Sequence, residues 1–149
     1  MTQLVFNRDE ELIRWAEATY PECAPIVGPV TTIGIVSSEG EIMAVAFYNN
    51  YRQNHGDIEI SLVAATPRWA TPGNIRALLH YPFVQLGVQR LTAHTTKANK
   101  RFRKILEHYG ARLEGVHPYW HLGKQTGVSY GLYRDVAMKQ IEGKTDEVA

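Results

Sequence analysis

Apolar residues recur at helical spacing in two parts of the chain. From Asp9 to Tyr20 they repeat every three or four positions, which predicts a first helix with Asn7 or Asp9 as its cap. A later helix is predicted just before Gly110, because that glycine sits where a left-handed C-terminal cap belongs. Its apolar face consists of Ala98, Phe102, Ile105, Leu106 and Tyr109.

Other segments show the alternation that is typical of β-strands. Residues 57–64 alternate apolar and polar side chains with a period of two. Strand-forming residues also fill 31–36 and 42–48, and Glu39-Gly40 between them suits a two-residue hairpin turn, because glycine tolerates a positive φ. Further strands are predicted at 88–95, 111–116 and 128–134.

Three segments interrupt these patterns. The polar stretch 49–56 is predicted to be a surface loop, and Tyr119 and Trp120 are expected in an aromatic loop between the last two strands. The apolar run 75–86 predicts a helix with a kink near Tyr81, because Pro82 has no amide proton and clashes with the preceding turn.

The resulting order is helix, hairpin, strand, helix, strand, helix and two strands. This order indicates an α+β, or mixed α/β, sheet domain. At 149 residues the chain suits one domain, which we place at residues 1–138. Residues 139–149 are polar and charged, and we expect them to fray as a C-terminal tail.

Composition narrows the classes of function. The 16 basic and 15 acidic residues nearly cancel, so no overall field favours nucleic acid or an anionic membrane. Cys23 is the single cysteine and cannot form an internal disulfide, which suits the reducing cytoplasm. No apolar run approaches the roughly 18 residues that span a bilayer. We therefore expect a soluble, cytoplasmic protein.

A candidate phosphate site follows the strand 57–64. The segment 68–74 joins a predicted strand to a predicted helix, where backbone amides and the positive end of the helix dipole suit an anion. Spacing alone does not distinguish this site from a plain structural turn.

Neighbouring motifs make the interpretation specific. Arg68, Thr71 and Gly73 occupy the three positions of a coenzyme A loop of the form Arg/Gln-x-x-Gly-x-Gly/Ala, with the middle glycine missing; a register with Gly73 as the middle glycine is also open. Three further segments match motifs of the same family: the strand entry at 87–93, the Asn-initiated helix at 99–110, and Arg-x-Glu-Gly at 112–115. Together they resemble the GCN5-related N-acetyltransferases (GNAT), closest in pattern to the branch that acetylates ribosomal-protein N-termini.

The resemblance implies a fold and a cosubstrate. The expected fold is a central, mostly antiparallel twisted sheet with a splayed central strand pair, flanked by helices. Acetyl-CoA would be the cosubstrate, with no metal. Its pantetheine arm would pair with the backbone of Leu62, Val63 and Ala64. The residues implied to hold the rest of it are Arg68, Trp69, Thr71, Gly73 and Asn74 around the pyrophosphate, and Asn99 at the pantetheine amide.

Acetyl transfer needs a base for the ammonium and often an acid for the thiolate. Glu59 and His94 are the candidate bases, on the strand before the loop and shortly before Asn99. The tyrosine that many relatives carry in the Asn-led helix is replaced by Leu106, so the acid is sought among the remaining tyrosines, with Tyr130 as the choice. His117 and His121 lack a third ligand for a metal.

Three functions remain open. The first is an N-acetyltransferase acting on a primary amine of a small molecule, a peptide N-terminus or a lysine. The second is a GNAT-fold protein that modifies nucleic-acid bases, and the third is a degenerate CoA-binding or interaction module. The second depends on an aromatic and basic set: Tyr48, Tyr51, Arg52, Lys97, Lys100, Arg101, Arg103 and Lys104. The resemblance leaves monomer and homodimer open.

Overall fold

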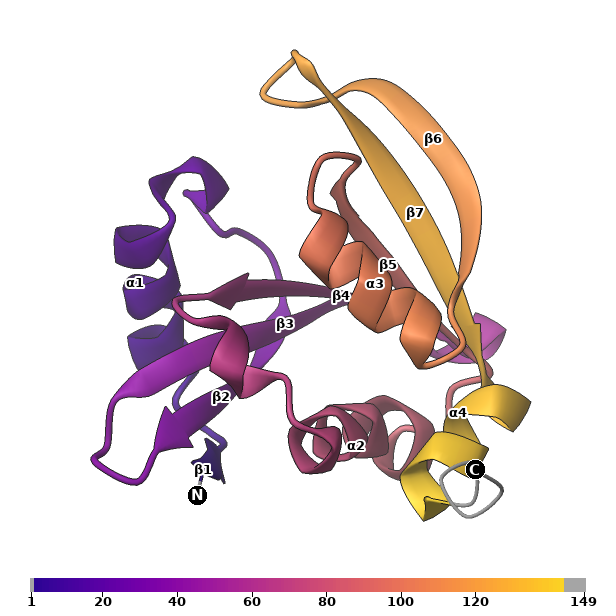
Figure 1. Ribbon diagram of the computed structural model, residues 1–149, viewed down its shortest axis with the longest axis horizontal. Helices are drawn as coiled ribbons and strands as arrows, with labels where there is room; N and C mark the ends of the chain where they lie inside the picture. Colours follow the sequence, from indigo (N-terminus) through magenta and orange to yellow (C-terminus); the bar gives the residue numbers. More distant parts are fainter. Residues whose placement is uncertain (1, 144–149) are drawn as a thin grey trace.

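The computed structural model describes residues 2–143. Within this range seven strands form one sheet in the order β1-β2-β3-β4-β5-β7-β6, seen as a fan in Figure 1. The strands are β1 (Thr2–Val5), β2 (Val30–Ser37), β3 (Ile42–Arg52), β4 (Asp57–Ala64), β5 (Arg90–Thr96), β6 (Arg112–His121) and β7 (Gln125–Tyr133). Of these strands, β4 and β5 run parallel. The other neighbouring pairs are antiparallel.

Helices cover the two faces of this sheet. They are α1 (Asp9–Thr19), α2 (Pro72–His80), α3 (Lys100–His108) and α4 (Arg134–Glu142). Short turns are η1 (Pro21–Cys23) between α1 and β2, η2 (Gln53–His55) between β3 and β4, and η3 (Pro67–Trp69) between β4 and α2; the π-helical turn η4 (Tyr81–Gln85) continues α2. In residues 2–143 no helix is long and apolar enough to cross a membrane.

Alternation along β3 divides the core into two clusters. Val45 and Phe47 pack with Leu12 and Ala16 of α1 on one face. Ala44, Ala46 and Tyr48 face the opposite way and join the larger cluster under α2 and α3. Because successive strand residues point to opposite faces, this one strand anchors both layers. The two faces are called the α1 face and the α3 face below.

The parallel pair separates part-way along its length. β4 and β5 are in register only from Asp57–Arg90 to Ile60–Ala93. Beyond those residues β4 stays paired with β3 as far as Ala64, and β5 stays paired with β7 as far as Thr96. The result is a V-shaped opening in the middle of the sheet. The expected mixed, mostly antiparallel sheet with one splayed pair is confirmed.

Several predicted elements agree closely with the structure. The strand predicted at 57–64 has those bounds. Gly110 has a φ of 96° after α3, as the cap argument required. The defect predicted at Pro82 is a π turn in which the Leu86 amide donates to the Tyr81 carbonyl at 3.0 Å. The wider turn accommodates a residue that cannot donate to the helical ladder.

Other details differ. The sequence reasoning missed β1, which pairs with β2, and β3 continues to Arg52 through half of the expected loop. The expected Asp9 or Asn7 cap is absent: Arg8 occupies the N-cap position of α1 without a side-chain capping bond. The Asp9 carboxylate instead accepts bonds from the Thr32 amide and hydroxyl at 2.9 and 2.5 Å. That long-range contact outweighs the local capping preference.

The aromatic loop is also a strand. Tyr119 and Trp120 lie in β6, and the hairpin turn comes later, where Leu122 and Gly123 have positive φ. The Trp120 ring lies over Gly127 of β7, where a β-carbon would come within 2.5 Å of the indole. The missing side chain at Gly127 makes room for the ring. At the C-terminus the chain is helical to Glu142, and residues 144–149 lie outside the described part.

Candidate functional site

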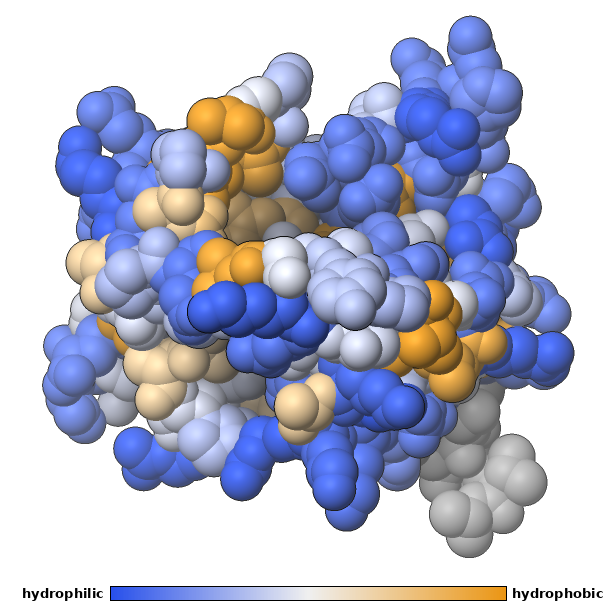
Figure 2. All heavy atoms as spheres, turned by 90° about the horizontal axis from the view of Figure 1, so that it is seen from above, coloured by the Kyte–Doolittle hydropathy of each residue, from blue (hydrophilic) through white to orange (hydrophobic). Residues whose placement is uncertain are grey.

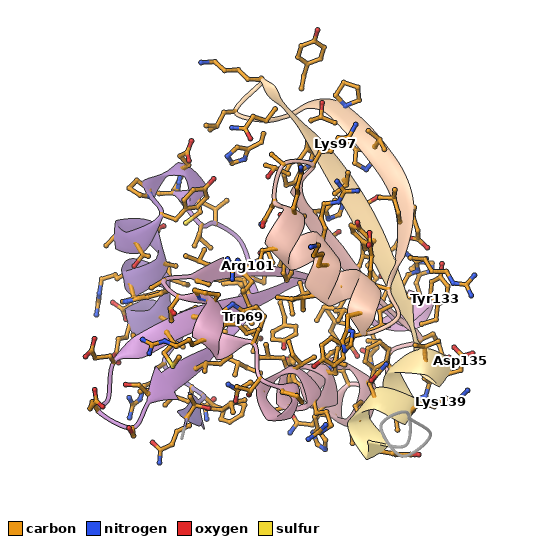
Figure 3. The ribbon with its side chains drawn as sticks, viewed as in Figure 1. Trp69, Lys97, Arg101, Tyr133, Asp135 and Lys139 are labelled. Atoms are coloured by element: carbon orange, nitrogen blue, oxygen red, sulfur yellow. The ribbon has the colours of Figure 1, made fainter. Side chains whose placement is uncertain are left out.

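A groove of about 270 Å³ opens where β4 leaves β5. Its walls are the end of β4, the turn η3 and the first turn of α3. Figure 3 labels Trp69 and Arg101, which lie on its two sides. Seen from above, the molecule has a hollow with hydrophobic atoms at its floor, between the α1 side and the α3 side (Figure 2). The lining residues are Leu62, Ala64, Ala65, Thr66, Pro67, Trp69, Asn99, Arg101, Phe102 and Ile105.

One side of β4 is open in this groove. Leu62, Val63 and Ala64 pair with Ala46, Val45 and Ala44 of β3, but β5 has already diverged on their other side. An open strand edge offers backbone donors and acceptors to an extended ligand. The three residues implied to hold the pantetheine arm therefore form an accessible edge.

The loop between β4 and α2 is held by its own polar groups. The Arg68 amide donates to the Thr66 hydroxyl at 3.3 Å, and the Asn74 amide donates to the Thr71 hydroxyl at 3.2 Å. The Asn74 side chain donates to the Trp69 carbonyl at 2.8 Å and accepts from Thr2. Because Asn74 and Trp69 are buried, they shape the loop from within.

The three motif residues of the loop are exposed, as are Pro67 and Pro72 beside them. Arg68, Thr71 and Gly73 all face solvent. A β-carbon at Gly73 would meet no atom within 4 Å, and its φ is not in the positive region. Neither packing nor backbone conformation requires glycine here. Its small size keeps the N-terminal turn of α2 accessible, which is the place where a helix attracts an anion.

Asn99 caps α3 and also lines the groove. Its side-chain oxygen accepts from the Phe102 amide at 3.3 Å, and its side-chain nitrogen donates to the Thr95 hydroxyl at 3.0 Å. Both polar atoms therefore have partners within the protein, so the cap is the role that these contacts support directly.

The two candidate bases lie beside each other on the α1 face. Glu59 is in register with Thr92, and His94 follows two residues later on the same face of β5. The His94 Nδ1 atom is 3.6 Å from a carboxylate oxygen of Glu59, and about 30% of each side chain is exposed (29% and 31%). The sequence offered them as alternatives. The parallel register makes them a pair.

A row of rings extends from this pair toward the hairpin tip. The ring row consists of His117, His94, Trp120, His121 and Tyr20. His94 stacks on Trp120 with centroids 6.0 Å apart and lies 6.2 Å from His117. At the far end the Tyr20 hydroxyl and His121 Nε2 are 3.0 Å apart, which joins the end of α1 to β6. Burial, with help from Glu22, raises the pKa of Tyr20, so its hydroxyl stays protonated.

Sequence reasoning missed the ring row. It weighed His117 and His121 only as metal ligands, and it placed Trp120 in a loop. Within residues 2–143 no group of three or more His, Cys, Asp or Glu side chains is placed to hold a metal ion. His117 instead pairs with the Ser129 hydroxyl at 3.1 Å. The aromatic composition of the hairpin was the available signal, but only the pairing of β6 with β7 shows where the rings point.

Nearer the start of β5 than His94, an ion pair and its neighbour join β5, β6 and β7. Arg90 contacts both carboxylate oxygens of Glu114 at 2.9 and 2.6 Å, and the Tyr133 hydroxyl also donates to Glu114. The Arg90 guanidinium holds the pKa of Glu114 below its ordinary value. Thr92 links this group to Asp57, which pairs with Arg52. These contacts pair both Arg90 and Arg52 with carboxylates.

Comparisons with known proteins identify the architecture. No model of a protein family matches the sequence, and a search of curated proteins finds no significant match. Solved structures do match. Spermidine N-acetyltransferase from Vibrio cholerae, in complex with CoA and spermine, superimposes with a TM-score of 0.74 at 12% identity, covering 92% of this chain and 98% of that one.

Two further structures agree with it. A protein from T. thermophilus assigned as an acetyltransferase has a TM-score of 0.75 at 18% identity, with 99% and 94% of the two chains covered. Ribosomal-protein-S5-alanine acetyltransferase from Vibrio fischeri has a TM-score of 0.71 at 12% identity, with 90% and 93% covered. This chain has the GNAT acetyltransferase fold. Enzymes with different acceptors match it about equally well, so the branch within the GNAT fold is not resolved.

Tyr130 lies on the opposite face of the GNAT sheet from Glu59 and His94. It is fully buried on the α3 face, while its neighbour Ser129 lies opposite His94. Its hydroxyl donates to Glu107 at 2.7 Å and accepts from Arg103 at 2.9 Å. Burial raises its pKa. The structure therefore does not bring the candidate acid together with the candidate bases.

Proposed function

We propose that this protein transfers the acetyl group of acetyl-CoA to a primary amine, by direct attack within a ternary complex. The observation that supports this most is the place where the sheet opens. The groove lies on the α3 face, and the Glu59–His94 pair lies on the α1 face beside Ile60 and Ala93, the last paired residues. A thioester held in the opening is then exposed to attack from the face that carries both bases.

The donor lies along the groove, with its pyrophosphate at the exposed first turn of α2. Thr71 and Gly73 leave this turn open, where the helix dipole attracts an anion, and Arg68 adds a positive charge. The pantetheine arm pairs with the open edge of β4 at residues 62–64. Asn99 borders the arm from the start of α3.

The chemistry needs one proton removed before attack and one after it. His94 accepts a proton from the ammonium, and Glu59 orients the imidazole and balances its charge. The amine nitrogen bonds to the thioester carbon, the carbon–sulfur bond breaks, and the second amine proton passes to water. The CoA thiolate leaves and takes a proton from water. The products are an amide and free CoA.

A cationic amine suits the acceptor face. Glu59 supplies negative charge, Trp120 supplies a π surface, and Arg90 and Arg52 are already paired with carboxylates. The neighbours in structure act on different amines: one is named for spermidine and another for the alanine of ribosomal protein S5. An amine screen should cover small molecules, peptide N-termini and lysines. A homodimer stays a prediction, which light scattering tests.

Calorimetry with acetyl-CoA tests the donor site. We expect the parent protein to bind acetyl-CoA, and we expect Gly73→Glu to weaken binding at least about tenfold, because a carboxylate would face the pyrophosphate. Gly73→Ala is the matched control: a β-carbon has free space there, so this variant retains binding. Absence of binding by the parent would contradict the proposed enzyme and favour the degenerate module.

The nucleic-acid alternative receives less support. Of its basic residues, Arg52 is paired with Asp57, and Arg103 bonds to Tyr130 and to the Lys97 carbonyl. These contacts give two of the basic side chains partners within the protein. A gel-shift series in increasing salt distinguishes the two functions, because phosphate contacts weaken steeply as salt rises.

A further inference from the structure

An apolar cavity adjoins the groove on the α3 face. It has a volume of about 60 Å³ and lies between α2, α3 and the sheet. Leu62, Trp69, Phe102 and Ile105 line both the groove and the cavity, so the two spaces share a wall. The cavity continues past Ile60, toward the C-terminal end of α3. The groove thus borders a deeper apolar space.

The apolar face of α3 is left incompletely covered by this space. α3 is strongly amphipathic, yet none of its residues is fully buried. Phe102, Ile105 and Leu106 are only partly buried, although they pack against the main core. Side chains that border an empty space lack contacts on that side, and an apolar cavity of this kind stays dry and takes apolar ligands.

The direction of the groove determines which part of a donor would reach the cavity. Asn99 and Arg101, at the start of α3, border the groove near the phosphate loop, whereas Leu106 and Tyr109, near its end, border the cavity. The nine residues of α3 span roughly 14 Å. A donor whose pyrophosphate lies at α2 therefore points its acyl group past Ile60 and Ala93, toward the cavity.

We propose that this cavity is an acyl-chain site, and that the protein accepts propionyl-CoA and butyryl-CoA as well as acetyl-CoA. This inference rests on the proposed function. A space of 60 Å³ holds roughly two methylene groups, at the volume of a water molecule for each. Butyryl, with two methylenes more than acetyl, fills it. Each methylene moved from water into this site is expected to tighten binding about fourfold.

Calorimetry with a chain-length series measures this directly. We expect the Kd to fall about fourfold from acetyl-CoA to propionyl-CoA and again to butyryl-CoA, and to rise for decanoyl-CoA, which exceeds the space. Transfer to one fixed amine should follow the same order in KM for the donor. A butyryl-CoA Kd equal to or weaker than that of acetyl-CoA overturns the acyl-chain site.

Variants that fill or enlarge the cavity make the test specific. Ala93 lines the cavity and is buried, so Ala93→Val occupies part of it and should abolish the roughly 15-fold preference for butyryl over acetyl. Leu106→Ala enlarges it and should move the optimum to a longer chain. Ala18→Val, the same change on an exposed position of α1, keeps the parent preference.

The possible failures are distinguishable. Binding of acetyl-CoA alone leaves the proposed function in place and rejects the acyl-chain site. Binding of none of the CoA esters rejects both. If Ala93→Val does not fold, Leu106→Ala still decides, because an unchanged chain-length optimum in that variant contradicts the proposal.

Discussion

The two faces of the sheet differ in chemistry at the point where β4 and β5 separate. The α3 face carries the groove and the apolar cavity, and Leu62 and Phe102 line both. The α1 face carries the Glu59–His94 pair and the ring row. Since strand residues alternate between faces, one V-shaped opening serves both environments. In the proposed reaction the donor binds along one face, while protons are transferred on the other.

The largest expected effect comes from removing the base. His94→Gln should lower kcat by about a hundredfold to ten-thousandfold, because general-base catalysis contributes on that scale. Glu59→Gln should have a smaller effect in the same direction, and the double variant should be less than multiplicative because the two act as a unit. Release of CoA thiol measures the rates.

The separation of the faces predicts the matching control. Both variants should bind acetyl-CoA with the parent Kd, since the pair is not part of the groove lining. A large loss of acetyl-CoA affinity in either variant would show that the α1 face contributes to the donor site, which would break the comparison between the faces.

A smaller effect is expected from the ring row. Trp120→Ala should raise KM for a cationic amine about tenfold with little change in the Kd of acetyl-CoA, because the indole offers a π face beside His94. Tyr119→Ala is the control: this neighbour is 76% exposed and does not belong to the row. Equal effects of the two substitutions would contradict a specific role for Trp120.

The smallest effect concerns stability rather than turnover. Arg90 and then Tyr133 hydrogen-bond the Glu114 carboxylate and lower its pKa from the ordinary value of 4.5. A lowered pKa stabilises the fold above 4.5, and the contribution is lost as pH falls through the folded-state pKa. Glu114→Gln should therefore lower the free energy of unfolding at pH 7, and the difference from the parent should shrink below pH 4.5.

Urea denaturation at pH 7 and in acid measures this difference. The difference in unfolding free energy between parent and variant should fall with added salt, because the ion pair is partly exposed. A difference that stays constant through the acidic range would assign the loss to packing rather than to the charge.

Local pattern determined much of the fold from the sequence alone. Alternation predicted β4 with its bounds, and the apolar spacing before Gly110 predicted α3. Pro82 predicted the defect after α2. The motif residues Arg68, Thr71 and Gly73 are exposed in their loop, and their role in binding stays a prediction. These features depend on neighbours a few residues apart, which is the range that a sequence pattern records.

Only the tertiary structure determined which residues distant in the sequence lie side by side. The Glu59–His94 pair depends on the register of a parallel strand pair whose members are joined by the whole of α2, and the ring row depends on how β6 bends over Gly127. Tyr130 was chosen for its chemistry, yet the phase of β7 places it on the α3 face. Register and phase are set by packing the whole sheet against its helices, and residues distant in sequence contribute most to that packing.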